Sequence, residues 1–155
     1  MVKKNKVIAI VQARLDSKRF PNKIIKKIDN YEVIRLLLSR LSHSKQIDEI
    51  ILATSQDINI KKLISIAKKE NIRTEIGDKN NVLKRYYNVA KNNNAKIIIR
   101  ITGDCPFVDP QLIDNNLNIF KKNNFDYLSN TIEPTYPDGL DFEIFSFDAL
   151  KIAYN

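Results

Sequence analysis

The sequence has one cysteine and one histidine, and it has no long apolar run. One cysteine, Cys105, excludes a disulfide within the chain, and we expect it to be a small buried residue. A thiol nucleophile needs a nearby histidine, but the only histidine, His43, falls at the end of a predicted helix. No apolar run reaches about 18 residues, and the apolar stretch at residues 7–11 is too short for a signal peptide. These absences favour a soluble cytoplasmic protein.

Glycine is also scarce, and the common glycine-rich nucleotide motifs are missing. The chain has three glycines and contains neither G-x-G-x-x-G nor G-x-x-x-x-G-K-[ST]. The first absence argues against a dinucleotide-binding domain and the second against a P-loop NTPase. Helix-turn-helix, zinc-ligand and RNA-binding aromatic signatures are absent as well.

Positive charge is in excess, with a formal net charge of +8 from 26 Lys and Arg against 18 Asp and Glu. A basic surface attracts phosphate, so a nucleic-acid partner has to be considered. Most of the lysines, however, fall singly or in pairs on predicted helix faces, as at positions 61–62, 68–69 and 121–122. Solvated lysines are the favoured interpretation, and no nucleic-acid partner is expected.

Hydrophobic periodicity predicts strands that alternate with helices. Apolar runs predict strands at residues 7–11, 49–54, 73–76, 96–101, 125–130 and 140–145. Three- and four-residue spacing predicts helices at residues 31–43, 59–70, 81–92, 110–122 and 146–154, the last capped by Ser146. This alternation predicts one α/β domain over residues 1–155, with a three-layer, doubly wound, mostly parallel sheet. Ligands of such sheets bind at the carboxyl ends of the strands, here after the first, second and fourth.

The loop after the first strand is rich in cations. Residues 12–23 contain Arg14, Lys18, Arg19 and Lys23 directly after a buried strand. Main-chain N–H groups and cations in such a turn suit a triphosphate, with Arg as a fork and Lys as a point charge. A basic loop that is simply solvated is the alternative.

Carboxylates follow the fourth strand and recur near the end of the chain. A triphosphate needs a divalent ion, and Asp104 is a candidate ligand for Mg²⁺, with a turn-capping aspartate as the alternative. Asp109, before Pro110, is expected to cap a helix. The two-residue period of a strand puts Asp141 and Glu143 on one face, where they could serve a substrate or pair with basic neighbours.

Four segments together resemble a known family. They are residues 11–23 (V-Q-A-R-x-x-S-x-R-x-P-x-K), 81–86, 100–106 and 136–143, in this order along nearly the whole chain. They closely resemble the cytidylyltransferases of the spore-coat polysaccharide protein F type, which are related to acylneuraminate and KDO cytidylyltransferases. The resemblance implies the nucleotide-diphospho-sugar transferase fold. It also implies the conversion of CTP and a sugar or sugar acid into a CMP-sugar and pyrophosphate for surface polysaccharide synthesis.

The resemblance also implies roles for individual residues. Arg14, Lys23 and Asp104 would be catalytic, and Asp104 would hold Mg²⁺. The nucleotide would be bound by Gln12, Ala13, Arg14, Ser17, Arg19, Lys23, Thr54, Asn81, Val82, Arg85 and Thr102. The sugar would contact Arg100, Asp138, Asp141 and Glu143. For Arg85, a surface position is an equal alternative, and a homodimer is expected by analogy.

The chain departs from the family pattern at two positions and in length. Asn22 stands where the family has glycine, and Asn81 stands where it has aspartate; asparagine tolerates a left-handed backbone. Family members continue beyond this point and carry a second metal-binding aspartate there. We therefore expect a domain that lacks its C-terminal part and has weak or no turnover. The rival interpretations are a glycosyltransferase of related fold, a non-catalytic nucleotide or nucleic-acid binder, and an inactive remnant.

Overall fold

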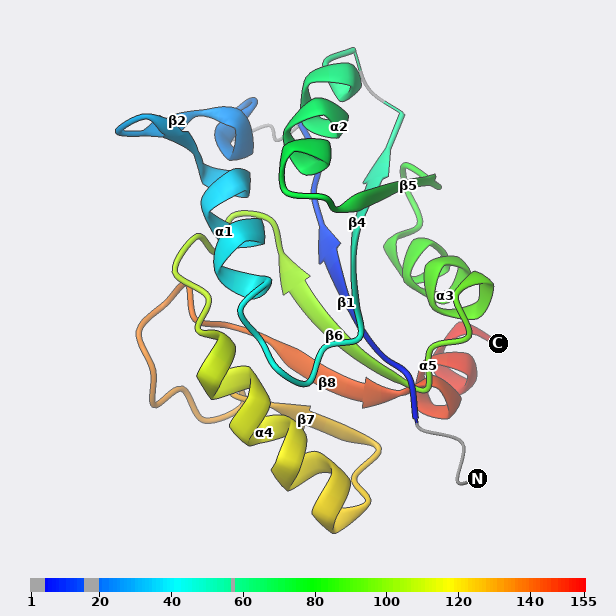
Figure 1. Cartoon of the computed structure of the whole chain (residues 1–155). Coiled ribbons are helices and arrows are strands. Elements are labelled where there is room, and N and C mark those ends of the chain that lie inside the picture. The colour runs from blue at the N-terminus through cyan, green and yellow to red at the C-terminus, as the bar shows by residue number, and fades with distance from the viewer. Residues whose placement is uncertain (1–4, 16–19, 57) are drawn as a thin grey trace.

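A six-stranded, mostly parallel sheet forms the centre of the protein (Figure 1). The computed structural model describes residues 5–15, 20–56 and 58–155. The sheet order is β5-β4-β1-β6-β8-β7, in which β5, β4, β1 and β6 are parallel and β8 is antiparallel to both β6 and β7. Its strands are β1 (Val7–Gln12), β4 (Glu49–Ser55), β5 (Arg73–Gly77), β6 (Ile97–Thr102), β7 (Tyr127–Ser129) and β8 (Glu143–Ser146).

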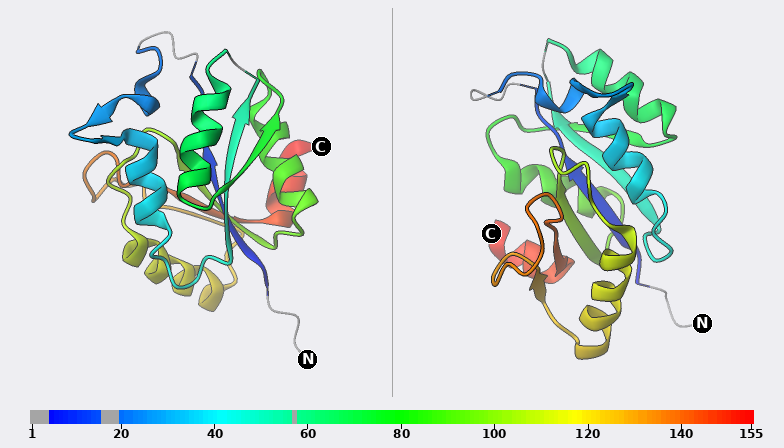
Figure 2. Two further views of the ribbon diagram at one scale, coloured as in Figure 1. Left: turned by 45° about the horizontal axis from the view of Figure 1, so that its top comes forward. Right: turned by 90° about the vertical axis from the view of Figure 1, so that its left-hand side faces the viewer.

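Helices cover both faces of this sheet, as the edge-on view in Figure 2 shows. The helices are α1 (Val33–Leu41), α2 (Ile60–Lys69), α3 (Val82–Asn92), α4 (Pro110–Asn123) and α5 (Phe147–Tyr154). Apolar side chains of α1, α2 and α4 join one buried cluster, and those of α3 and α5 join the other. The predicted three-layer, doubly wound α/β fold is thereby confirmed.

The apolar runs of the sequence account for these layers. In β1, Ile8 and Ile10 enter the cluster beneath α3 and α5, while Ala9 and Val11 enter the cluster beneath α1, α2 and α4. A central parallel strand has to be apolar on both faces, because each face is covered by helices. The predicted solvated lysines of α2 and α4, at positions 61, 62, 68, 69, 121 and 122, are all exposed.

The strand order reverses between β1 and β6. The chain moves from β1 to β4 and β5 on one side, and then returns to place β6 against the other side of β1. Register pairs Gln12 with Thr102 at the carboxyl ends of the two strands. In doubly wound sheets the loops that leave neighbouring strands in opposite directions border the ligand-binding crevice, so the crevice is expected at this end of β1 and β6.

Short elements near the first loop differ from the prediction. Residues 31–43 were expected to form one helix, but Tyr31–Glu32 forms β3, which pairs with β2 (Lys27–Ile28) in a small hairpin. Asp29 adopts a φ of 54° within that hairpin, and α1 begins only at Val33. Two-residue strands carry no period long enough to be recognised from sequence. None of the helices in the described ranges is long and apolar enough to cross a membrane.

Candidate active site

The loops that follow β1 and β6 meet at the crevice. The N–H of Gly103 donates to the carbonyl of Gln12 over 2.7 Å, and the N–H of Ala13 donates to the carbonyl of Ala53 over 3.1 Å. A Cβ atom at position 103 would lie 2.9 Å from the Gln12 carbonyl oxygen and 3.2 Å from the Cβ of Ala13. Only glycine permits this approach, and the approach brings the basic and acidic loops together.

An ion pair joins the two loops. Asn22 has φ 58° and ψ 19°, and the 3-10 turn η1 (Lys23–Ile25) starts directly after it. Lys23 Nζ lies against Asp104 Oδ2, with the two side chains 33% and 38% exposed. Asparagine thus tolerates the left-handed backbone at the family's glycine position, as expected, and the turn directs Lys23 toward the loop after β6.

Asp104 is ionised in this setting. Partial burial opposes its charge, but the hydrogen bonds from Lys23 and Thr102 prevail and lower the pKa of the Asp104 carboxyl below its ordinary value. Cys105 is 7% exposed and its Sγ lies 3.1 Å from Thr102 Oγ1, while burial raises the pKa of its thiol. Cys105 is therefore a buried, protonated residue, as expected, and an unsuitable nucleophile.

The rest of the basic loop is described only in part. Arg14 is exposed and Ala13 is buried. Ser17 and Arg19, for which the resemblance implies nucleotide binding, lie outside the described residues. Gln12 Oε1 is buried and has no hydrogen-bond partner among the described residues, so an acceptor oxygen is held at the end of β1. Such an atom normally has a partner, because an unsatisfied buried acceptor is costly.

The predicted base-binding residues lie at the ends of β4 and β6 and at the start of α3. Thr54 and Ser55 are 2% and 1% exposed. Asn81 caps α3 by accepting the N–H of Lys84 over 2.8 Å, so one of the N–H groups expected to face a ligand is occupied. Val82 is half-buried and Thr102 is partly exposed at the end of β6.

Arg85 is fully buried, so the alternative that it is a surface residue is wrong. Its Nη1 donates to the carbonyl of Asp78, and its Cγ would lie 3.0 Å from a Cβ at position 77. The side chain of Asp78 in turn accepts the N–H groups of Asn80 and Asn81, each over 2.9 Å. Sequence reasoning missed Asp78, which organises the entry into α3 together with Arg85.

The residues assigned to the sugar fall into two groups. Arg100 Nη1 donates to Glu143 Oε1 over 2.7 Å, across the antiparallel β6–β8 pair. Asp138 and Asp141 lie instead in the loop before β8, where burial and the charge of Asp138 raise the pKa of Asp141. The expectation that Asp141 and Glu143 share a strand face is wrong, because β8 begins at Glu143. The alternative, that these carboxylates pair with basic neighbours, is confirmed for Glu143, which pairs with Arg100.

Sequence reasoning also missed a cavity between α3 and α5. It has a volume of about 380 Å³ and is lined by Val82, Leu83, Tyr86, Arg100, Tyr127, Glu143, Phe145, Ala149, Leu150 and Ala153. Tyr86 is 2% exposed, and its hydroxyl lies 3.4 Å from the carbonyl of Ile10. The available sequence signal for a polar contact here was Tyr86 on the apolar face of a predicted helix, because a buried hydroxyl requires a hydrogen-bond partner.

The described residues fit a metal site in which the protein supplies one or two ligands and a bound nucleotide and water supply the others. Within residues 5–15, 20–56 and 58–155, no group of three or more His, Cys, Asp and Glu side chains lies close enough together to hold an ion. Magnesium commonly takes one or two carboxylates and completes its shell with phosphate oxygens and water. An ionised Asp104 at the crevice matches that mode. Asp109 is not part of it, since it caps α4 by accepting the N–H groups of Gln111 and Leu112.

Comparisons with known proteins agree with this geometry. An uncharacterized protein of Methanocaldococcus jannaschii is 38% identical over 151 residues, which are 96% of this chain and 60% of that protein. The spore coat polysaccharide biosynthesis protein SpsF of Bacillus subtilis is 33% identical over 114 residues, which are 71% of this chain and 48% of that protein. Several 3-deoxy-manno-octulosonate cytidylyltransferases match at lower identity.

Solved structures and a family model extend the match to most of the chain. A cytidylyltransferase from Leptospira borgpetersenii superposes with a TM-score of 0.91 at 33% identity, covering 95% of this chain and 63% of that one. The chain thus spans about half to two thirds of the length of these relatives. A family model described as cytidylyltransferase matches residues 8–155. With the crevice, the basic loop and the ionised Asp104 in the expected order, the chain belongs to the cytidylyltransferase family.

Proposed function

We propose that the chain binds CTP with Mg²⁺ and transfers its cytidylyl group to a hydroxyl of a sugar or sugar acid, releasing pyrophosphate. Family membership supports the nucleotide, and the contact between Lys23 and Asp104 carries the proposal. In this proposal Lys23 is the phosphate-binding cation and Asp104 is the metal-binding carboxylate, and the two are in contact near the reversal of strand order. A triphosphate with its divalent ion requires both groups at one place.

Lys23 and Arg14 bind the β- and γ-phosphates in this proposal. Both come from the segment that follows β1. In the absence of ligand, Lys23 neutralises Asp104. With the nucleotide bound, the ammonium group of Lys23 would contact the phosphates, and Asp104 would hold Mg²⁺. Ser17 and Arg19, outside the described residues, are proposed to extend the same phosphate contacts.

Magnesium supplies charge neutralisation for the departing pyrophosphate. The chain's own residues orient the reaction around it. The cytidine is proposed to lie against residues at the ends of β1, β4 and β6 and at the start of α3. They are Gln12, Ala13, Thr54, Asn81, Val82 and Thr102. Arg85 belongs to the same proposed set, and its Nη1 also holds that helix start in place by donating to the carbonyl of Asp78.

The acceptor side is assigned to Arg100, Glu143, Asp138 and Asp141. The acceptor hydroxyl oxygen attacks the α-phosphorus, the bond from this phosphorus to the β-phosphate oxygen breaks, and the hydroxyl proton passes to solvent. No covalent enzyme intermediate forms. Positive charge at Lys23 and Arg14 stabilises the negative charge that grows on the leaving group. The homodimer and the lack of a nucleic-acid partner stay predictions.

A glycosyltransferase is disfavoured by the family match and by the segment after β6. That segment reads Gly103-Asp104-Cys105-Pro106 and lacks the Asp-x-Asp motif usual in metal-dependent glycosyltransferases. Such an enzyme would bind a finished nucleotide sugar in preference to a free nucleoside triphosphate. The two functions are therefore separated by which nucleotide binds.

Calorimetric titration with CTP and with a nucleotide sugar tests the proposal. We expect CTP with Mg²⁺ to bind, and we expect Lys23→Met and Asp104→Asn each to weaken binding about tenfold, since a hydrogen bond to a charged group contributes about 1.5–3 kcal/mol. Lys62→Met, an exposed lysine of α2, is the matched control and should leave affinity unchanged. Equal affinities in all four proteins would contradict the proposed site.

A further inference from the structure

The loop between β6 and α4, which carries Asp104, consists of two consecutive turns. The N–H of Cys105 donates to the carbonyl of the last β6 residue over 3.2 Å, and the N–H of Val108 donates to the carbonyl of Cys105 over 3.3 Å. Gly103, Cys105 and Val108 are buried, whereas Asp104 is exposed. The buried residues thus hold the loop against the core, and Asp104 lies on its outer side.

A side chain from a distant helix binds the second of these turns. Arg40 lies in the last turn of α1. Its Nε donates to the carbonyl of Val108 over 2.9 Å, and its Nη2 lies 3.5 Å from the carbonyl oxygen of Phe107. One planar guanidinium therefore reaches two successive carbonyl groups, and its rigid fork fixes their direction better than a lysine ammonium would.

Other contacts fix the two ends of this loop. At its start, the N–H of Gly103 donates to the carbonyl of Gln12 over 2.7 Å. At its end, Asp109 caps α4 by accepting two N–H groups. Arg40 binds the stretch between these ends, at the two residues directly before the cap. The loop that carries Asp104 is therefore held by the sheet on one side and by α1 on the other.

The carbonyl groups that Arg40 binds need a donor. Phe107 and Val108 lie outside the strands and helices, and Val108 is 0% exposed. Buried carbonyl groups in a loop depend on side chains or water for their hydrogen bonds. A charged donor makes a stronger hydrogen bond than a neutral one. We therefore expect the second turn to shift when Arg40 is removed.

We propose that Arg40 is a positioning residue for Mg²⁺ binding, because it holds the turn at Phe107 and Val108 and thereby the carboxylate of Asp104. The proposal rests on the function proposed above, in which Asp104 holds the ion beside the triphosphate. Arg40 itself contacts neither the nucleotide nor the metal. Its whole effect on binding passes through Asp104.

The geometry of magnesium coordination makes this placement matter. Magnesium demands near-ideal octahedral geometry, with ligand distances of about 2.0–2.1 Å. A displacement of about 0.5 Å is enough to loosen such a site. Lys23 acts as a point charge on a flexible stem, so its contact with a phosphate tolerates the same displacement. Loss of Arg40 should therefore weaken the Mg²⁺-dependent part of CTP binding and spare the remainder.

Calorimetric titration with CTP in EDTA and in Mg²⁺ tests the proposal. The quantity compared is the dissociation constant in EDTA divided by that in Mg²⁺. Because Mg²⁺ binds free CTP equally in every titration, variants differ in this ratio only through the protein. We expect Arg40→Met to lower the ratio about fivefold, less than the 10–100-fold typical of residues that touch a metal ligand directly, and to leave the dissociation constant in EDTA unchanged. An unchanged ratio, or equal weakening in both buffers, would overturn the proposal.

The same substitution in an Asp104→Asn background separates positioning from direct contact. Because Arg40 acts through Asp104, Arg40→Met should change the ratio little once Asp104 has been altered. An equal effect in both backgrounds would show that Arg40 acts independently of Asp104 and would contradict the proposal. Arg40→Lys keeps the charge and a donor, so it should recover part of the ratio that Arg40→Met loses.

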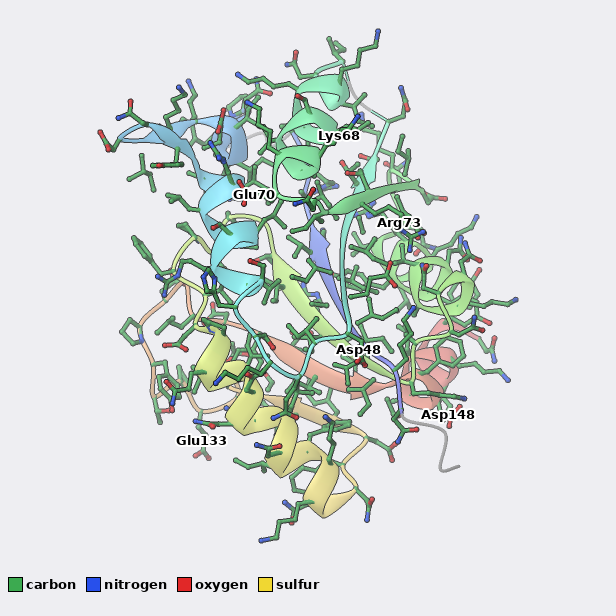
Figure 3. The ribbon with its side chains drawn as sticks, in the orientation of Figure 1. Asp48, Lys68, Glu70, Arg73, Glu133 and Asp148 are labelled. Carbon is green, nitrogen blue, oxygen red and sulfur yellow. The ribbon has the colours of Figure 1, made fainter. Side chains whose placement is uncertain are left out.

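Arg35→Met is the matched control on the same helix. Arg35 Nε donates to Glu70 Oε1 over 2.6 Å, and Glu70 lies beside α1 toward α2, away from α4 (Figure 3). This variant breaks an ion pair of α1 without touching the loop that carries Asp104, so the ratio should stay unchanged. An equal loss in Arg35→Met and Arg40→Met would assign the effect to α1 as a whole and overturn the proposal.

Hydrogen exchange separates a local shift from general destabilisation. In Arg40→Met, the N–H groups of Cys105 and Val108 should exchange faster, whereas that of Ile10 in the central strand β1 should not. Equal acceleration at both places would contradict local positioning. Absence of CTP binding by the unaltered chain would refute the proposed function and this inference with it. CTP binding with a normal ratio in Arg40→Met would refute the positioning role alone.

Discussion

Lys23 and Asp104 form an ion pair although 81 residues separate them in the chain. Lys23 stands at the end of the loop that follows β1, as the first residue of η1, and Asp104 stands two residues after the end of β6. Neither side chain is deeply buried, so the pair contributes little to stability, about 0–1 kcal/mol for exposed pairs in general. Its importance lies in bringing together the proposed phosphate-binding cation and the proposed metal-binding carboxylate.

Because of this pair, we expect the free energy of unfolding to fall at acid pH. Because the pKa of Asp104 is lowered in the folded state, ionisation of Asp104 stabilises the fold above the ordinary aspartate pKa of about 3.9. That contribution is lost as pH falls through the folded-state pKa. Urea unfolding measured from about pH 6 down to about pH 2 should show a smaller decline in the free energy of unfolding for Asp104→Asn than for the unaltered chain. Identical declines would mean that Asp104 is not held as described.

Gly103 should tolerate no side chain. A methyl group there would lie 2.9 Å from the Gln12 carbonyl oxygen, so Gly103→Ala has to push the two loops apart. We expect a loss of about 1–3 kcal/mol in unfolding free energy, as for other overpacked sites, together with weaker CTP binding. Gly139→Ala is a useful comparison, because a Cβ at position 139 meets nothing within 4 Å and only its φ of 96° is unfavourable. A fully stable Gly103→Ala with normal CTP affinity would argue against the close contact.

Asn22 should be replaceable by glycine but not by alanine. Its φ of 58° lies in the left-handed region, where Cβ crowding costs most residues about 1–2 kcal/mol. Asn22→Ala should therefore lower the melting temperature by roughly 2–4 °C for each kcal/mol lost, and Asn22→Gly should not. Differential scanning calorimetry distinguishes them, and equal melting temperatures would show that the turn relaxes.

Asn81 should act through its oxygen rather than through charge. It accepts the N–H of Lys84, so Asn81→Ala should cost about 0.5–2 kcal/mol as other N-cap removals do. Asn81→Asp restores the residue that the family pattern carries and keeps the cap, so its chemical unfolding midpoint should match or exceed that of the unaltered chain. A midpoint for Asn81→Ala equal to that of Asn81→Asp would show that the cap has no role.

Long periodic segments made most of the fold predictable. The run that became β1 is apolar at every position from Val7 to Val11, and α2 repeats buried positions at helical spacing. The β2–β3 hairpin was missed because each strand has two residues. The start of β8 was placed three residues early because the residues from Leu140 to Phe142 continue its apolar pattern, although they lie outside the strand.

The candidate site was predictable only where a sequence motif directly follows the carboxyl end of a strand. The loops containing Lys23 and Asp104 follow strands, so the reversal of strand order brings them together. The burial of Arg85 could not be foreseen, since an arginine on an amphipathic helix is usually solvated. The backbone of Gly77 approaches its side chain so closely that a Cβ atom at position 77 would lie 3.0 Å from the Arg85 Cγ. The cavity between α3 and α5 depends on how these helices pack, and the only local signal was the position of Tyr86 on the buried face of α3.

The central claim is that this chain binds CTP at the crevice between β1 and β6. A thermal-shift panel of CTP, UTP, ATP and GTP with Mg²⁺ tests it most directly, because stabilisation rises with ligand concentration over the dissociation constant. We expect CTP to raise the melting temperature more than the other three nucleotides, and we expect Lys23→Met to reduce the shift with each nucleotide, because Lys23 is proposed to bind the phosphates that all four share. An equal shift with all four nucleotides, or none with any, would contradict the central claim.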